Sequence, residues 1–156
     1  MTAEPKQYKQ PISVLVVIHN AAGEVLLLER ADAAGFWQSV TGSRDGEESL
    51  HETVAREVFE ETGLRVEEHV LSDWGYHNVY EIYPCWRHRY APGIEHNTEH
   101  VFGLCVRGDV SIKLAEREHT RYAWLPWADA AAKVFSPSNA EAIRRLPGAL
   151  GGGVEN

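Results

Sequence analysis

An acidic cluster within residues 42–64 is the feature of this sequence that most clearly suggests chemistry. Seven acidic side chains lie between Asp45 and Glu61, accompanied by only two basic ones, Arg44 and Arg56. Carboxylate oxygens are the ligands that hard cations such as Mg²⁺ and Mn²⁺ prefer, and protein-bound Mg²⁺ commonly also binds the phosphates of a substrate. The cluster therefore suggests a metal-dependent site for a phosphorylated compound.

Three of these carboxylates crowd one turn of a predicted helix. Glu57 and Glu61 are four residues apart, and Glu60 is three residues from Glu57. Glu57 and Glu61 also fall on the apolar side of the helix, near Leu50 and Val54. Like charges at this spacing disfavour a helix, and partial burial would cost more. A bound cation would compensate for both penalties.

A second interpretation of the cluster needs no ligand. The same residues could form a solvated acidic helix in which Arg56 pairs with Glu60, since runs of charge usually cover exposed faces. The two interpretations differ in where the Glu57 and Glu61 side chains should lie. The first places them against the apolar side of the helix, and the second places them in water.

The spacing of residues 42–64 matches a long motif at every position. Gly42 is followed after five residues by Glu48, and after seven more by the sequence REVFEETGL of residues 56–64. This pattern is the Nudix box, and the chain resembles the Nudix hydrolases, which cleave nucleoside diphosphates linked to another group. Gly42 and Gly63 are expected to let the backbone turn.

The resemblance to the Nudix family implies a fold and a set of roles. The fold would be a mixed β-sheet sandwiched between helices, with the box as a loop, a helix and a second loop. Glu57, Glu60 and Glu61 would face a divalent metal, with Glu57 and Glu61 as its direct ligands. Arg56 and Glu48 would orient and brace these carboxylates.

Several stretches outside the box resemble a group of bacterial Nudix enzymes, the dihydroneopterin triphosphate pyrophosphatases of folate synthesis. These stretches are YKQPISVLVVI, FWQSVTGS, RHRYAPG, NTE and EHTRYAWL, spread over residues 8–125. The resemblance implies hydrolysis of dihydroneopterin triphosphate to the monophosphate and pyrophosphate. Mg²⁺ is the implied cofactor, with Mn²⁺ as a substitute.

The same resemblance assigns further site residues. Glu118 matches a late-loop glutamate that joins the helix carboxylates at the metal, or that acts instead as the general base, whereas Glu116 fits the spacing to Trp124 less well. The implied catalytic residues are Glu57, Glu60, Glu61, Glu118 and Arg56. The implied substrate contacts are Lys9, Arg30, Thr41 and Ser136. Two of these contacts are cationic, as a triphosphate requires, although Lys9 and Arg30 taken singly could be ordinary surface residues.

Two other functions are compatible with the sequence. The box alone does not separate a pterin triphosphatase from a Nudix pyrophosphatase that acts on canonical or damaged nucleoside triphosphates. A binding or regulatory module that keeps the fold without catalysis is a third hypothesis. Such a module would be expected to lack some carboxylates of the box, and here all are present.

Two further groups of residues have competing interpretations. Residues 85–93, CWRHRYAPG, gather basic and aromatic side chains that could shield the phosphates or flank the pterin, or could form an edge strand whose charges discourage aggregation. His119 beside Glu118 is interpreted as a structural or supporting group rather than a nucleophile. A zinc site would have to draw on Cys85, His88, His96, His100 and Cys105. These residues lack the short paired spacings typical of zinc ligands.

The composition argues against several classes of protein. The 156 residues include 15 basic and 23 acidic side chains, a formal net charge of −8. Such a chain lacks the basic face that binding to nucleic acid or to an anionic membrane requires. Cys85 and Cys105 are too few for a disulfide scaffold and are expected to be reduced. Without a long apolar segment or a signal peptide, a cytoplasmic protein with a small-molecule partner is expected, and its oligomeric state is not indicated.

The elements that must position these residues follow from local patterns. Residues 1–147 are expected to form one α/β (α+β layered) domain, followed by a flexible tail at 148–156. Ser49 and Glu52 form a capping box and Gly63 a C-terminal cap for the first helix, and Ser138 with Glu141 opens the second. Strands are expected at 12–18 and 24–30, which form a hairpin, and at 35–42, 78–83, 98–106 and 121–125, with helices at 49–62 and 138–146.

Overall fold

Strand β1 (Ile12–His19) lies at the centre of the fold in the computed structural model, which describes residues 7–151. The other strands are β2 (Glu24–Arg30), β3 (Trp37–Gln38), β4 (Val40–Ser43), β5 (Val70–Glu81), β6 (His96–Cys105) and β7 (His119–Pro126). They form one seven-stranded sheet of order β3-β2-β1-β6-β5, with β4 paired to β1 and β7 paired to β2. Only β1 and β6 run parallel, so the sheet is mixed, as predicted.

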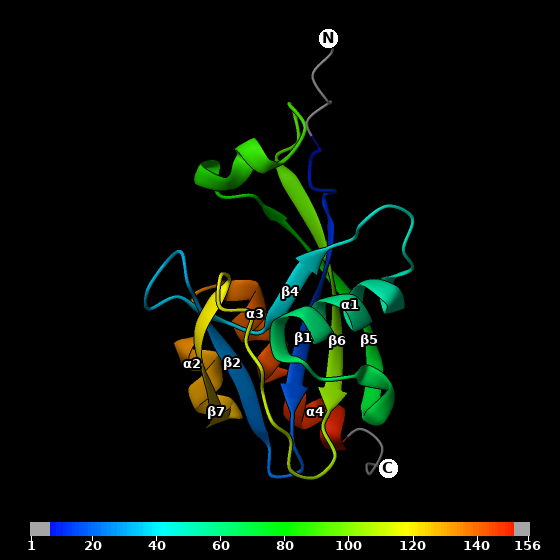
Figure 1. Cartoon of the computed structure of the whole chain (residues 1–156), viewed down its shortest axis with the longest axis vertical. Coiled ribbons are helices and arrows are strands. Elements are labelled where there is room, and N and C mark those ends of the chain that lie inside the picture. The colour runs from blue at the N-terminus through cyan, green and yellow to red at the C-terminus, as the bar shows by residue number, and fades with distance from the viewer. Residues whose placement is uncertain (1–6, 152–156) are drawn as a thin grey trace.

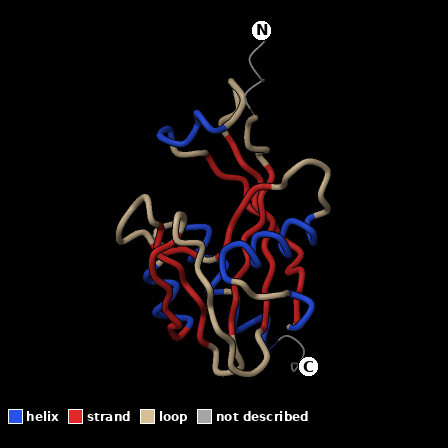
Figure 2. Tube along the Cα trace, viewed as in Figure 1, coloured by secondary structure: helices blue, strands red, loops and turns tan. Residues whose placement is uncertain are grey.

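Helices cover both faces of this sheet (Figures 1 and 2). They are α1 (Leu50–Thr62), α2 (Trp127–Lys133), α3 (Pro137–Arg144) and α4 (Leu146–Gly151), with 3₁₀ helices η1 (Val66–Glu68) and η2 (Pro84–Arg89). Side chains alternate along β1, so Val14 and Val16 join the core beneath α1, whereas Leu15 and Val17 join the core of α2, α3 and α4. The predicted layered α/β fold is confirmed. No helix within residues 7–151 is long and apolar enough to cross a membrane.

The sheet splits where β1 changes its partner. Val16 of β1 pairs with Val40 of β4, whereas His19 at the end of β1 pairs with Val25 of β2. Beyond that point β2 pairs with β3, at Leu28 and Glu29, while β7 pairs with β2 along its whole length. The two strands of the predicted hairpin, β1 and β2, therefore pair near the turn and separate farther from it. The single strand predicted at 35–42 is in fact two, β3 and β4, which lie on opposite sides of the split.

The predicted boundaries of α1 are confirmed. The Ser49 side chain accepts a hydrogen bond from the Glu52 amide, and the Glu52 side chain accepts one from the Ser49 amide. Gly63 ends the helix with a φ of 78°, a left-handed conformation that favours glycine. Gly42 has no positive φ. The expectation that Gly42 is needed for a turn is therefore wrong, and its role lies in a close contact described below.

The C-terminal helices differ from the prediction. Ser136, not Ser138, caps α3 by accepting a hydrogen bond from the Asn139 amide, so the predicted capping box of Ser138 and Glu141 is wrong. The short helix α2 was not predicted, because its seven residues carry no capping signal. Residues 148–151 belong to α4 rather than to an irregular tail, and the rest of the predicted tail lies outside the described residues.

Residues 80–95, here called the β5–β6 arm, extend beyond the layered part of the fold (Figure 1). Within the arm, residues 84–89 form η2, so the edge-strand interpretation of this segment is wrong. Strand β5 itself begins at Val70, eight residues before the predicted start. Both cysteines are free, and they lie far apart, Cys85 in η2 and Cys105 at the opposite end of β6.

Gly103 of β6 lies against the indole of Trp74. A Cβ atom at position 103 would come within 2.5 Å of the Trp74 Nε1 atom, and Trp74 packs against the core of α2, α3 and α4. We expect Gly103→Ala to lower the free energy of unfolding by about 1–3 kcal/mol, because the indole must leave its packed position. Urea denaturation measures the change. An unaltered midpoint would contradict the predicted clash.

Candidate active site

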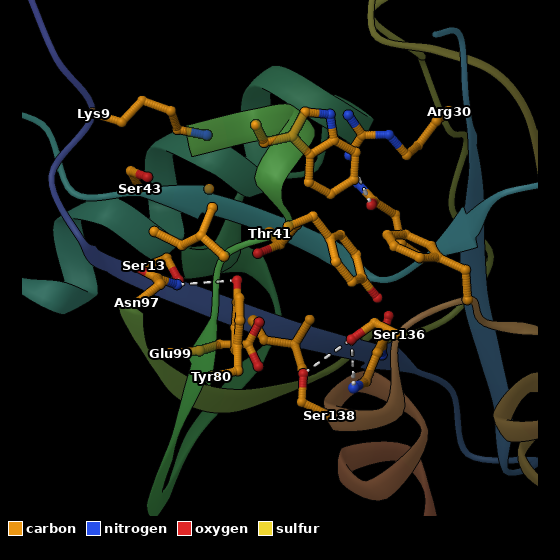
Figure 3. Close-up of a pocket in the computed structure, with 18 of the residues that line it drawn as sticks. Lys9, Ser13, Arg30, Thr41, Ser43, Tyr80, Asn97, Glu99, Ser136 and Ser138 are labelled. Carbon is orange, nitrogen blue, oxygen red and sulfur yellow. Dashed lines mark hydrogen bonds between the residues drawn. The ribbon is translucent and has the colours of Figure 1, made fainter. Parts of the chain in front are cut away.

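A pocket of about 580 Å³ opens beside the split in the sheet (Figure 3). Its walls come from β1, β3, β4, the start of α3, the turn before β7 and the β5–β6 arm. Six of the residues expected to bind substrate or metal line it: Lys9, Arg30, Thr41, Glu61, Glu118 and Ser136. The fold thus brings together side chains that are spread over more than 120 positions of the sequence.

Two of the three clustered carboxylates of α1 are buried, and the third is exposed. The side chains of Glu57 and Glu61 are only 12% and 2% exposed. Burial raises the pKa of Glu61 well above its usual value, and the neighbouring Glu57 carboxyl raises it further. Burial also raises the pKa of Glu57. Glu60, in contrast, is 49% exposed. The solvated-helix interpretation is therefore wrong for Glu57 and Glu61, whereas Glu60 is exposed and pairs with Arg56 as that interpretation predicted.

Hydrogen bonds from Arg56 connect Glu57 to the loop that precedes α1. Its Nε and Nη2 atoms donate to the two oxygens of Glu48 at 2.7 and 3.0 Å, and Nη1 donates to Glu57 at 3.0 Å and to Glu60 at 3.3 Å. Nη2 also donates to the Ser43 carbonyl of β4 at 3.0 Å. Hydrogen bonding to Arg56 lowers the pKa of Glu48 to about 2. The geometry supports the bracing role expected of Arg56 and Glu48.

Gly42 explains how Glu57 can lie so close to β4. A Cβ atom at this position would overlap the whole carboxyl group of Glu57. The first glycine of the motif is therefore required by space for a side chain of α1, because any larger residue would push Glu57 out of its position.

The turn before β7 supplies one further carboxylate to the pocket. Glu118 lines the cavity and its charge helps to raise the pKa of Glu61, whereas Glu116 is exposed outside it. His119 Nε2 lies 3.9 Å from the nearest Glu61 oxygen, but burial lowers the pKa of His119 to about 4. The imidazole is therefore neutral at pH 7, and its Nε2 can accept a hydrogen bond from the Gln38 amide at 3.2 Å. His119 thus has the supporting position that was expected.

The Glu57–Glu61 pair fits a hard divalent cation. Oε1 of Glu61 is buried and has no hydrogen-bond partner among the described residues, so it can serve as a ligand. Across residues 7–151, no three His, Cys, Asp or Glu side chains gather closely enough to enclose a metal ion, and the five residues weighed as zinc ligands are no exception. Mg²⁺ does not need such an enclosure, because it keeps water molecules and binds phosphates beside one or two carboxylates.

The cationic side of the pocket is fixed by its neighbours. Arg30 donates to both oxygens of Asp32 at 2.8 and 2.7 Å and to Gln38 at 3.2 Å, and its guanidinium lies 4.7 Å from the ring centre of Trp86. Partial burial and then the charge of Arg89 lower the pKa of Lys9. These two cations line the same pocket as Glu61 and Glu118, and binding of a polyphosphate requires such positive charge.

Thr41 and Ser136 also have partners within the protein. The Thr41 hydroxyl donates to the Val14 carbonyl at 2.9 Å, which leaves its oxygen free to accept. Ser136 caps α3, and its hydroxyl lies 3.0 Å from that of Ser138. Both side chains line the pocket, and their roles toward substrate stay predictions.

The rest of the pocket lining was predicted only in part, since residues 85–93 were expected to flank the pterin or shield the phosphates. Its aromatic and apolar wall comes from the β5–β6 arm and the loop before α3, and its polar floor from β1, β6 and α3. The wall consists of Tyr80, Ile82, Tyr83, Trp86, Tyr90 and Phe135, and the floor of Ser13, Asn97, Glu99, Ser138 and Asn139. The repeated aromatics between residues 80 and 90 were a signal for the wall. The burial of the floor is a tertiary feature with no local sign.

Known proteins share this architecture. Residues 9–146 match the NUDIX domain family. The chain is 42% identical to the dihydroneopterin triphosphate diphosphatase of Escherichia coli (strain K12), with 90% of this chain and 95% of that one covered. It is 39% identical to the Haemophilus influenzae protein of the same name, with 89% of each covered. The solved structure of the E. coli dihydroneopterin triphosphate pyrophosphohydrolase superposes with a TM-score of 0.83, at 42% identity, over 90% of this chain and 97% of that one.

Proposed function

The chain belongs to the Nudix domain family, and we propose that it hydrolyses dihydroneopterin triphosphate to dihydroneopterin monophosphate and pyrophosphate. This chain is a Nudix hydrolase, and Nudix hydrolases act on small phosphorylated molecules. The observation that carries the proposal is that Glu61, Glu118, Lys9 and Arg30 line one pocket. Two relatives that bear this activity in their names cover nearly the whole chain and support the choice of substrate.

The metal requirement follows from the family and from the carboxylates. Nudix hydrolases generally require a divalent metal, and we propose Mg²⁺, held by Glu57 and Glu61 with Glu118 close by. When bound, the ion neutralises phosphate oxygens and lowers the pKa of a bound water. Arg56 keeps Glu57 in place through its bonds to Glu48 and to β4.

Residues of the chain itself perform the remaining steps. Lys9 and Arg30 hold the phosphate chain, so that one phosphorus faces the carboxylates. Glu118 accepts the proton of the attacking water, a contribution of about 10²–10⁴-fold in rate for a well-placed base. The new P–O bond forms as the bond to the pyrophosphate group breaks, and pyrophosphate leaves.

The proposal is tested by pyrophosphate release from dihydroneopterin triphosphate, dATP and dGTP, each with Mg²⁺ or with EDTA. We expect kcat/KM to be highest for the pterin and turnover to disappear in EDTA. A strong preference for a purine nucleotide would instead favour the alternative nucleotide pyrophosphatase. Absence of hydrolysis with every substrate, together with ligand binding by calorimetry, would favour a binding module.

Three expectations about the setting of this activity stay predictions. They are the absence of a nucleic-acid partner, the absence of a membrane partner and the cytoplasmic location. The acidic net charge of −8 supports the first two.

A further inference from the structure

Glu99 is a buried carboxylate that the proposed reaction does not use. It lies on β6, where it pairs with Ser13 of β1 and Asn78 of β5, and its residue surface is only 4% exposed. Glu99 lines the same pocket as the phosphate-binding cations. Figure 3 shows Lys9 and Arg30 at one end of the view, and Glu99 with Tyr80 and Ser138 at the other. A molecule that extends along the pocket would therefore present a different group to Glu99 than to the cations.

The hydrogen-bonding capacity of Glu99 is incompletely used. Within the described part of the chain, its Oε1 atom is buried and has no hydrogen-bond partner. Burial raises the pKa of the carboxyl, although the nearby Ser138 and Asn78 side chains partly offset this effect. A buried acceptor that lacks a donor destabilises a protein, and a carboxylate does so more than a neutral group. A ligand that offers N–H groups would remove this penalty.

The surroundings of Glu99 are held in a fixed arrangement. Asn97 lies two residues away on the same face of β6, with its Nδ2 atom 2.7 Å from Ser13 Oγ and 3.1 Å from Tyr80 Oη. Oδ1 of Asn97 is a second buried acceptor without a partner among the residues that the structure describes. Two unpaired acceptors thus lie on the same face of β6, on the floor of the pocket. They would match a ligand edge that carries donors.

The aromatic walls of the pocket suit a flat ring. Tyr83, Trp86 and Phe135 form an aromatic cluster, with ring centres 5.3 Å apart for Tyr83 and Trp86 and 6.3 Å apart for Trp86 and Phe135. All three line the pocket, as does Tyr80. Aromatic side chains stack on planar heterocycles and give little discrimination among them. Discrimination must therefore come from the polar floor.

We propose that Glu99 determines the ring specificity of this enzyme by accepting two hydrogen bonds from the pterin, one from the ring N3–H and one from the adjacent 2-amino group. The inference rests on the proposed function and adds the residue that selects its heterocycle. A carboxylate has two acceptor oxygens and so matches two neighbouring donors on one edge. A thymine ring offers one N–H flanked by carbonyl oxygens, so that one Glu99 oxygen would face another acceptor.

The test compares Glu99→Gln with wild type on dihydroneopterin triphosphate and dTTP. Glutamine has nearly the same shape, but its Nε2–H₂ would meet the 2-amino donor of the pterin, whereas it could donate to a thymine carbonyl. We expect kcat/KM for the pterin to fall roughly 10- to 100-fold, mainly through KM, the range expected for losing a bond to a charged group. The value for dTTP should be unchanged or should rise. Glu99→Asp, which keeps the charge and shortens the reach, should give an intermediate loss.

Glu95→Gln is the matched control, because Glu95 is exposed at the end of the β5–β6 arm, just before β6, and undergoes the same change of charge. Its kinetics should equal those of the wild type. A thermal melt of each variant monitors folding. If kcat/KM of Glu99→Gln for dihydroneopterin triphosphate stays within about twofold of the wild-type value, the assignment of Glu99 is overturned. The proposed function still holds in that case, provided that the wild type hydrolyses this substrate.

A binding measurement separates the inference from the proposed function. Neopterin, which has the ring and no phosphates, is titrated into each protein and followed by its fluorescence. Weaker binding to Glu99→Gln than to wild type and Glu95→Gln supports the inference, even if the wild type hydrolyses dTTP and not the pterin triphosphate. That pattern would refute the proposed function alone. If the wild type does not bind neopterin, or if Glu99→Gln binds it equally well, the inference is refuted.

Discussion

Glu61→Gln is expected to lower kcat by about a thousandfold or more while the protein stays folded. The reason is the position of Glu61, whose carboxyl is 2% exposed and has an oxygen without a hydrogen-bond partner in the described structure. Glutamine has the same shape but cannot supply an anionic ligand. Metal-ion stabilisation of the transition state is worth several kcal/mol, and about 4 kcal/mol corresponds to a thousandfold in rate. Steady-state kinetics and Mn²⁺ titration measure the two losses.

Glu47→Gln is the control for this variant. Glu47 lies in the exposed loop before α1 and undergoes the same change of charge, so its variant should keep wild-type kinetics. Wild-type turnover by Glu61→Gln would refute the assignment of Glu61 as a metal ligand.

The same variant has a second readout in the metal-free protein. Because the pKa of Glu61 is raised in the fold, the folded protein keeps a proton that the unfolded chain has lost above about pH 4.5. Stability of the wild type should therefore fall relative to Glu61→Gln as the pH rises from about 4.5 toward the raised pKa. Urea denaturation in EDTA at several pH values measures this difference. Parallel pH profiles for the two proteins would contradict it.

Gly42→Ala should abolish most of the activity by a different route. The added methyl group would overlap the Glu57 carboxyl, which must then move away from β4 and from Glu61. A displacement of about 1 Å in a catalytic arrangement can cost about 100-fold in rate, and we expect a loss of at least that size in kcat. A crystal structure of the variant would show the Glu57 side chain in a new position.

Gly103→Ala provides the matched comparison. It adds the same methyl group at another crowded glycine, but Gly103 does not line the pocket. The two variants should therefore have opposite effects: Gly42→Ala loses activity with its fold intact, and Gly103→Ala loses stability with its activity intact. Full activity in Gly42→Ala would contradict this prediction. It would show that the backbone of β4 shifts to make room for the methyl group and that Glu57 keeps its position.

The part of the fold that could be predicted is the part specified by local signals. Helix α1 has a capping box at Ser49 and a left-handed glycine at Gly63, and both lie within a few residues of the ends they define. The burial of Glu57 and Glu61 also followed from their position beside apolar residues on one helix. The motif then located Arg56 and Glu48, because its spacing fixes where the helix places each side chain.

The part that could not be predicted depends on contacts between distant segments. The split between β1 and β2 arises because β4 pairs with β1 at Ser13–Val16 and leaves β2 only the end of β1 at His19, and no local pattern reports such competition. The cap of α3 was misplaced because Ser136 and Ser138 are equally good caps by composition. Glu99 was noticed only within the NTE sequence, since its burial depends on Ser13 from β1 and on α3.

The β5–β6 arm has a consequence for how such an enzyme can diversify. The arm supplies Tyr83 and Trp86 to the pocket from outside the layered fold, whereas the carboxylates of α1 are fixed within it. Changes in the length or composition of this arm can therefore remodel what lies against the ring without moving the groups that break the phosphate bond. The same catalytic carboxylates can in this way be combined with different arms that select different substrates. Exchanging the arm between relatives is therefore a direct way to change substrate specificity.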